Sequence, residues 1–246
     1  MKLSTYPNPL LRSWRCQEGL AGPTTWYRAW RLLFQVLFSA FWGVRAYNRR
    51  HEPDAGSVLY ICNHQSYLDP PLVGLALRRP MNYMARDSLF GNRLFGRLIR
   101  SFNAFPLRRA SADTGALKEA LRRLKAGGQL VVFPEGTRTR DGRIGQFLPG
   151  VSMLAKRAAD WVVPTLIDGA YECWRRSQLL PSPGQIYVLY GRPLGRQEIE
   201  AMEGEELVNT VRARLVEMQR ELRAHLGRPR ILYHEERQEH EGHEEY

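Results

Sequence analysis

The chain has 246 residues, of which 43% are hydrophobic, and its formal net charge is +11. This size suits one large domain with appendages, or two small ones, and the hydrophobic content is enough for a real core. The three cysteines, Cys16, Cys62 and Cys173, are odd in number and far apart, which excludes a disulfide framework and a cysteine metal site. The excess of basic residues favours anionic partners, namely nucleic acid, anionic lipid headgroups or phosphorylated metabolites.

The first segment with a clear pattern covers residues 26–48. Residues 32–44 are apolar except for Gln35 and Ser39, and this run is shorter than the roughly 20 residues that a membrane-spanning helix needs. Aromatic residues and flanking arginines are typical of a helix at the membrane interface. The pattern therefore favours a helix lying in one leaflet. A helix that packs on the core of the domain is the alternative, and both descriptions can hold together.

From residue 57 onward, apolar runs alternate with amphipathic patterns. The predicted strands are 57–62, 82–86, 103–107, 129–133, 162–167 and 185–190. The predicted helices are 70–78, 92–101, 114–126, 149–159 and 204–226. This alternation predicts an α/β fold, with one domain built on a mixed, largely parallel sheet that is flanked by helices.

The pattern also predicts three parts of the chain. Residues 1–50 form an N-terminal helical region that associates with a membrane through an amphipathic helix, and residues 51–230 form the main domain. Residues 231–246 form an acidic tail, because the last thirteen residues hold six Glu and one Arg. Such a composition predicts disorder.

Two polar motifs each follow a predicted strand. His64 and Asp69 come after the strand 57–62, and the hexapeptide Phe-Pro-Glu-Gly-Thr-Arg at 133–138 continues the strand 129–133. Ligands of open α/β sheets bind at the carboxyl ends of strands. The two motifs are therefore expected to share one site.

The first motif pairs a base with a carboxylate. A histidine can accept a hydroxyl proton near neutral pH, and a carboxylate that fixes its tautomer makes it a better base. The alternative for this spacing is that Asp69 caps a helix while His64 is a polar residue of the core. Cys62 stands two residues before His64, so a cysteine nucleophile is conceivable, but a buried strand cysteine is the favoured interpretation.

The second motif is far more specific. Gly136 lets the chain turn and approach a ligand, and Arg138 can grip a phosphate with two parallel hydrogen bonds. Glu135 is suited to bind substrate hydroxyls or to hold Arg138. The alternative is a surface turn with an exposed Glu–Arg pair, which contributes little stability.

The motifs together resemble the glycerophosphate acyltransferase superfamily, and within it most closely the 1-acyl-sn-glycerol-3-phosphate acyltransferases. Four blocks carry the resemblance, in the same order and at matching spacing, over roughly residues 50–195. They lie at 63–69, 104–109, 133–138 and 162–167. The third block is complete, the first is strong in its company, and the other two are weak alone.

The resemblance implies roles for individual residues. His64 would be the general base, and Asp69 would orient it. The residues implied to bind the acceptor substrate are Arg109, Glu135, Gly136, Thr137 and Arg138. Asn103 stands where relatives usually carry glycine, and Arg108 stands where they often carry an acid. These two departures leave the acceptor headgroup open.

The implied activity is transfer of a fatty acyl chain to the free hydroxyl of 1-acyl-glycerol-3-phosphate, which gives phosphatidate for phospholipid synthesis. The donor would be acyl-CoA or acyl carrier protein, and no cofactor or metal is implied. The expected location is the cytoplasmic face of a membrane, as a peripheral or monotopic protein in contact with membrane lipids. Another lysolipid or alcohol as acceptor is one alternative. A basic nucleic-acid-binding protein is the alternative outside enzymes, although the chain has no nucleic-acid-binding motif.

Overall fold

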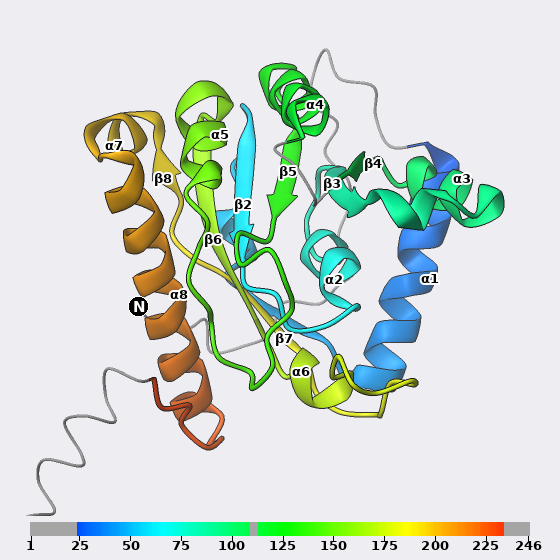
Figure 1. The fold of residues 1–246 in the computed structure, drawn as a ribbon. Coiled ribbons are helices and arrows are strands. Elements are labelled where there is room, and N and C mark those ends of the chain that lie inside the picture. Colours follow the sequence, from blue (N-terminus) through cyan, green and yellow to red (C-terminus); the bar gives the residue numbers. More distant parts are fainter. Residues whose placement is uncertain (1–23, 109–112, 234–246) are drawn as a thin grey trace, which may run out of the picture.

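The computed structural model describes residues 24–108 and 113–233. A single eight-stranded sheet forms the centre, and helices cover both of its faces (Figure 1). The strands are β1 (Arg45–Tyr47), β2 (Val58–Cys62), β3 (Met81–Arg86), β4 (Ala104–Leu107), β5 (Gln129–Val132), β6 (Trp161–Asp168), β7 (Tyr187–Tyr190) and β8 (Leu194–Gly195). Their order is β1-β7-β6-β2-β5-β3-β4, and β8 pairs with β6.

Most neighbouring strands run parallel, because helical crossovers join them. The exceptions are the pairs β6–β7 and β6–β8, which are antiparallel. The mixed, largely parallel sheet predicted from the sequence is thereby confirmed. Strand β2 lies in the middle, between β6 and β5, and its five residues are buried.

The α-helices are α1 (Thr25–Trp42), α2 (Asp69–Leu75), α3 (Arg93–Ser101), α4 (Thr114–Lys125), α5 (Gly150–Ala158), α6 (Ala170–Cys173), α7 (Arg196–Ala201) and α8 (Gly204–His225). Two 3-10 helices, η1 (Arg49–His51) and η2 (Asp87–Phe90), complete the described elements. The start of α4 shows how local sequence sets a boundary. Asp113 accepts a hydrogen bond from the Ala116 N–H, as a helix N-cap should.

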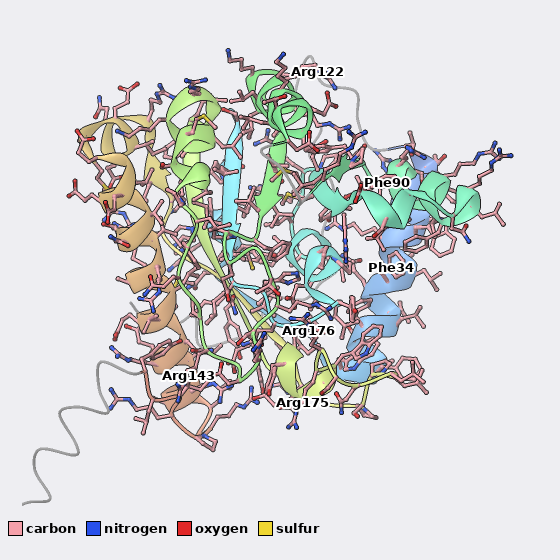
Figure 2. The ribbon with its side chains drawn as sticks, viewed as in Figure 1. Phe34, Phe90, Arg122, Arg143, Arg175 and Arg176 are labelled. Carbon is pink, nitrogen blue, oxygen red and sulfur yellow. The ribbon has the colours of Figure 1, made fainter. Side chains whose placement is uncertain are left out.

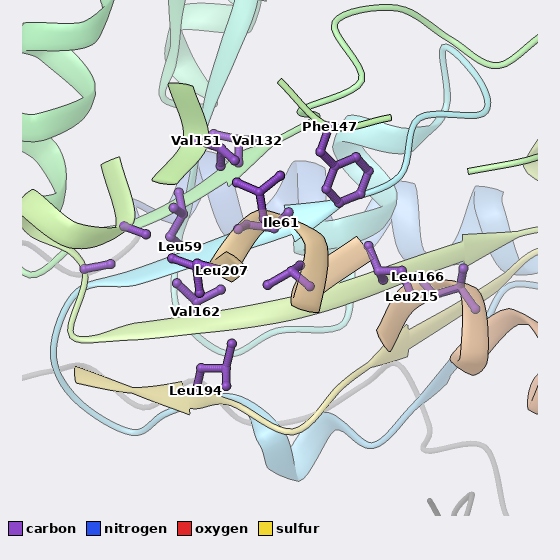
Figure 3. Close-up of a cluster of buried hydrophobic side chains, with 14 of the residues drawn as sticks. Leu59, Ile61, Val132, Phe147, Val151, Val162, Leu166, Leu194, Leu207 and Leu215 are labelled. Atoms are coloured by element: carbon purple, nitrogen blue, oxygen red, sulfur yellow. The ribbon is translucent and has the colours of Figure 1, made fainter. Parts of the chain in front are cut away.

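Alternate residues of β2 face two separate hydrophobic clusters. Leu59 and Ile61 point toward α5 and α8, where they pack with residues such as Val162 of β6 and Leu215 of α8 (Figure 3). Val58, Tyr60 and Cys62 point to the opposite face of the sheet and pack toward α1, α2 and α6. Because successive strand side chains point to opposite faces, a single apolar run supports both layers of helices.

The N-terminal segment differs from its expected extent. Helix α1 ends at Trp42, because Gly43 adopts a left-handed conformation with φ of 46° and its N–H caps the helix. Residues 45–47, expected to continue the helical region, form β1 and pair with β7 instead. Strand β8 and the short helices α6 and α7 were also not predicted.

Helix α1 packs on the domain mainly through one face, and Trp26 at its start also donates a hydrogen bond to Ser101 Oγ of α3 at 3.0 Å. Arg31 Nε and Gln35 Nε2 both donate to the Leu75 carbonyl at the end of α2, at 3.1 and 2.7 Å. The opposite face carries exposed apolar side chains, namely Trp26, Leu32, Leu33, Val36, Leu37 and Phe41. Within residues 24–108 and 113–233, no helix is long and apolar enough to cross a membrane.

The predicted three-part division of the chain stays a prediction. The boundary at residue 50 falls just after β1, which belongs to the sheet. Most of the predicted acidic tail, residues 234–246, lies outside the described residues.

Candidate active site

The register of two neighbouring parallel strands brings the motifs together. Ile61 of β2 pairs with Val132 of β5. His64 and Glu135 each lie three residues beyond this pair, so both chains leave the sheet side by side. The His64 N–H donates to Glu135 Oε1 at 2.8 Å.

Asp69 orients the His64 ring. His64 Nδ1 lies 2.7 Å from Asp69 Oδ2, and the backbone N–H groups of Gln65 and Ser66 donate to the same oxygen at 2.5 and 2.7 Å. A carboxylate can only accept, so Nδ1 carries the proton of its bond. This tautomer leaves Nε2 with a lone pair that can take a proton.

Two further contacts fix the position of the ring. The His64 ring stacks on Phe133 with centroids 4.4 Å apart. The side-chain amide of Asn63 binds both the N–H and the carbonyl of Ile167 on β6, at 2.8 and 2.9 Å. The chain before His64 is thus clamped to one neighbouring strand, and the ring rests on the other.

Glu135 links the backbone at His64 to the loop that follows β5. Its second oxygen accepts a hydrogen bond from the Gly145 N–H at 3.1 Å. Burial raises the pKa of the Glu135 carboxyl to about 7, against the lowering effect of the two N–H donors; the nearby charge of Asp69 adds to the increase. Both carboxylate oxygens therefore hold backbone, one at His64 and one in the loop that follows β5.

The rest of the second motif forms a tight turn at the surface. Gly136 has a φ of +68°, a conformation that residues with a Cβ rarely adopt. Thr137 beside it is exposed. The Arg138 guanidinium lies over the Tyr67 ring, 3.4 Å from its centroid, and its Nη1 has no hydrogen-bond partner among the described atoms. Arginine held on an aromatic face retains its donors for an anion.

The predicted site residues are brought together where the structure describes them. This group comprises His64, Asp69, Glu135, Gly136, Thr137 and Arg138. Arg109 lies outside the described residues. Within the described ranges, no group of three or more His, Cys, Asp or Glu side chains is placed to hold a metal ion.

Cys62 is not arranged as a nucleophile. It ends β2 fully buried, and burial raises its thiol pKa well above the usual value; the charges of Asp69 and Glu135 add to this. A thiol that stays protonated is a poor nucleophile. The favoured interpretation, a buried strand cysteine, agrees with this geometry.

An apolar cavity of about 320 Å³ opens beside the motifs. It begins at Tyr67 and Pro70 and runs between α1, α2, β3 and α3. Its other lining residues include Phe34, Gly74, Ala85, Leu98, Ile99 and Phe102. Sequence reasoning missed Tyr67, which touches both the cavity and Arg138, although it stands inside the stretch from His64 to Asp69.

Comparisons with known proteins agree with this arrangement. A 1-acyl-sn-glycerol-3-phosphate acyltransferase from Bacillus subtilis is 25% identical over 174 residues, which cover 70% of this chain and 84% of that protein. One from Cocos nucifera is 30% identical over 162 residues, which cover 65% of this chain and 53% of that protein.

A solved structure is also similar. The crystal structure of the 1-acyl-sn-glycerophosphate acyltransferase PlsC from Thermotoga maritima has a TM-score of 0.71 and 27% sequence identity, and the match covers 80% of this chain and 79% of that chain. Residues 43–168, half of the chain, match the model of the family described as Acyltransferase. This range contains strands β1 to β6, His64, Asp69 and the turn at Gly136, and the chain therefore belongs to the acyltransferase family.

Proposed function

We propose that the chain transfers a fatty acyl group from a thioester to the free hydroxyl of 1-acyl-glycerol-3-phosphate, giving phosphatidate. The observation that carries the proposal is the His64 ring: Asp69 holds its Nδ1, and Nε2 has no hydrogen-bond partner among the described residues. Tyr67, three residues further along the chain, lines the apolar cavity and lies under the Arg138 guanidinium. The names of the similar proteins from Bacillus subtilis and Thermotoga maritima support this acceptor. A nucleic-acid-binding function has no comparable support.

The chemistry follows from the tautomer of His64. Nε2 removes the proton of the acceptor hydroxyl as its oxygen attacks the thioester carbonyl. Asp69 stabilises the imidazolium that forms. The tetrahedral intermediate then collapses, the C–S bond breaks, and the imidazolium proton passes to the departing sulfur. The products are an ester and a free thiol, and His64 returns to its starting state.

The surroundings of His64 suit the two ends of the reactants. The cavity is lined mainly by apolar side chains and suits a fatty acyl chain. Arg138, Gly136 and Thr137 lie at the surface turn, where they bind the acceptor phosphate and keep the hydroxyl in position for attack. The donor is acyl-CoA or acyl carrier protein, and the proposed steps use no cofactor and no metal.

We place the enzyme on the cytoplasmic face of a membrane, as a peripheral or monotopic protein. The exposed apolar face of α1 supports this location, together with Leu94 and Phe95 of α3, which are also exposed. The arginines of α3, such as Arg93 and Arg97, stand beside these residues in the sequence and favour anionic headgroups. The cavity lies between α1 and α3, so its lining begins where acyl chains of the leaflet would be.

The decisive test compares His64→Ala with the wild type. Transfer of radiolabelled palmitoyl from its CoA thioester to 1-acyl-glycerol-3-phosphate is measured in mixed micelles. We expect a loss of at least about 100-fold in kcat, since general base catalysis supplies about 100- to 10,000-fold. His225→Ala, a change of an exposed histidine on α8, is the matched control and should keep full activity. Equal rates for His64→Ala and wild type would rule out the proposed base.

Arg138→Ala tests the phosphate site. Because Arg138 is proposed to hold the acceptor phosphate, we expect the acceptor KM to rise about tenfold or more while the donor KM stays the same. Steady-state kinetics with each substrate varied in turn separates the two constants. An unchanged acceptor KM would remove Arg138 from the phosphate site.

Ala85→Phe tests the assignment of the acyl chain to the cavity. Ala85 lies on β3 and lines the cavity, so a phenyl ring there shortens the space. We expect kcat/KM for a palmitoyl donor to fall about tenfold relative to a decanoyl donor. Ala126→Phe, at the exposed end of α4, is the control. The same ratio of the two donors in all three proteins would place the chain elsewhere.

The raised pKa of Glu135 gives a pH dependence of stability. In the folded protein the Glu135 carboxyl stays protonated up to about pH 7, whereas the usual pKa of a glutamate carboxyl is 4.5. Its contribution to the free energy of unfolding is therefore full below pH 4.5 and is lost as pH rises through about 7. When the pH is raised from 5 to 8, the free energy of unfolding of Glu135→Gln should fall by about 2 kcal/mol less than that of the wild type.

Urea denaturation at the two pH values measures this difference. Glu119→Gln serves as the control, because arginine neighbours, first of all Arg122, lower the pKa of the Glu119 carboxyl to about 2. That group is ionised throughout the range, so the control should follow the wild type. If Glu135→Gln also follows the wild type, the buried carboxyl does not titrate there.

A further inference from the structure

The loop between α6 and β7 presents an unusual surface. Leu179 and Leu180 expose 90% and 73% of their surface, the first being the most exposed large hydrophobic residue in the described part of the chain. Arg175 and Arg176 on the same loop are also exposed. Two adjacent leucines that are largely exposed to water, close to two cations, are more informative than a single exposed leucine, which is common.

This loop has a defined internal structure. The Ser182 N–H donates to the Cys173 carbonyl at 2.7 Å and closes the base of the loop. Gln178 organises the turn, since it accepts hydrogen bonds from the Arg175 N–H at 2.9 Å and from Trp174 Nε1 at 3.2 Å. The two leucines follow this turn directly. Their exposure therefore belongs to a hydrogen-bonded loop whose base is closed.

The loop contacts the C-terminal end of α1. Trp42 Nε1 donates to the Ser182 carbonyl at 2.9 Å, and the Ile186 N–H donates to the Trp42 carbonyl at 3.0 Å. Figure 1 shows the segment after α6 running beside the C-terminal end of α1. Phe41, an exposed residue of α1, contacts Trp42 with ring centroids 5.9 Å apart. The apolar face of α1 and the loop therefore meet at this end of the helix.

The two arginines of the loop have no carboxylate partner in the described part of the chain, and Arg175 lies over the Tyr171 ring, 5.3 Å from its centroid. Neither Arg175 nor Arg176 forms an ion pair with a carboxylate in residues 24–108 or 113–233; the nearest acid in sequence, Glu172, is held by Arg223 and Arg228. Figure 2 shows Arg175 and Arg176 at the end of the molecule that carries α6, and Arg122 of α4 at the opposite end. These guanidinium groups are available to phosphate oxygens outside the protein.

The loop also touches the active site. Ser66 Oγ donates to the Trp174 carbonyl at 3.1 Å. The Trp174 ring contacts Tyr67 with centroids 5.1 Å apart, and Tyr67 in turn carries the Arg138 guanidinium. A surface that held this loop would therefore lie next to the phosphate site and the His64 motif.

We propose that residues 174–182 form a second lipid-contact segment, in which Leu179 and Leu180 insert into an anionic leaflet while Arg175 and Arg176 bind its phosphate groups. This inference rests on the proposed membrane-bound function, and it adds a contact beyond α1 and α3. Leucine side chains gain from leaving water, and basic residues near an anionic surface add electrostatic attraction. Since the loop meets the end of α1 and Trp174 contacts Tyr67, the same leaflet would contact α1, the loop and the surface beside the active site.

Vesicle binding of the full chain tests the segment. Leu179→Ser/Leu180→Ser should bind about tenfold more weakly to vesicles of phosphatidylcholine and phosphatidylglycerol, and also to vesicles of phosphatidylcholine alone. Arg175→Gln/Arg176→Gln should bind about tenfold more weakly to the anionic vesicles only. Arg122→Gln/Lys125→Gln removes the same charge at the opposite end and should bind like the wild type. All variants should transfer palmitoyl from its CoA thioester in detergent micelles at the wild-type rate.

The failures of the two proposals are distinguishable. A wild-type protein that binds neither kind of vesicle overturns the membrane-bound function and this inference with it. Wild-type binding that both loop variants retain overturns only the loop contact. If Arg175→Gln/Arg176→Gln keeps vesicle binding but raises the donor KM in micelles, the arginines bind phosphates of the acyl donor, and the lipid assignment is wrong.

Discussion

One carboxylate oxygen of Asp69 determines the position of His64, the proposed base. It receives His64 Nδ1 and the backbone N–H groups of Gln65 and Ser66, so the ring and the chain that carries it depend on the same acceptor. Asp69 is fully buried, and three hydrogen bonds to Oδ2 replace water at that oxygen, whereas Oδ1 has no hydrogen-bond partner among the described atoms. The position of Asp69 at the start of α2 links this requirement to the packing of that helix against β2. Loss of the carboxylate would remove both the hydrogen bond that fixes the tautomer of His64 and the two that hold the backbone of residues 65 and 66.

The sheet determines what lies beside this base. The parallel register of β2 and β5 places Glu135 next to the His64 backbone, and the clamp from Asn63 to Ile167 fixes the same segment to β6. His64 is therefore held from both neighbouring strands, and its precision comes from the rigid centre of the molecule. The turn at Gly136 starts from the same strand end, which places Arg138 at the same mouth. Sites that rest on central strands need little reorganisation when substrates bind.

The parts predictable from sequence are those encoded by local periodicity. Apolar runs such as Val58–Cys62 and the capped helix Thr114–Lys125 appear where the patterns placed them. Strand β1 was missed because its three residues follow the apolar helix after only two residues, and the left-handed Gly43 was the sole local signal of the break. The antiparallel pairing of β7 with β6 depends on contacts distant in sequence, which no local pattern encodes.

The same division applies to the site. The spacing of His64 and Asp69 and the turn at Gly136 are local, so the sequence alone identified them. The contact of Glu135 with the His64 N–H depends on strand register, and the contacts of Tyr67 with Arg138 and Trp174 join segments that are distant in sequence. Neither could be read from spacing. The role of Arg109 stays a prediction.

Tyr67 connects the apolar and the charged halves of the site. Its ring lines the cavity, carries the Arg138 guanidinium and contacts Trp174 of the exposed loop. An acyl chain and a phosphate need opposite environments, yet the proposed reaction joins the acyl donor and the phosphate-bearing acceptor beside one imidazole. An aromatic ring can serve both, because it presents apolar surface to a chain and a partly negative face to a cation. In the proposed reaction, the order cavity, Tyr67, Arg138 would separate hydrocarbon from phosphate by one side chain, with His64 three residues before Tyr67 in the same motif.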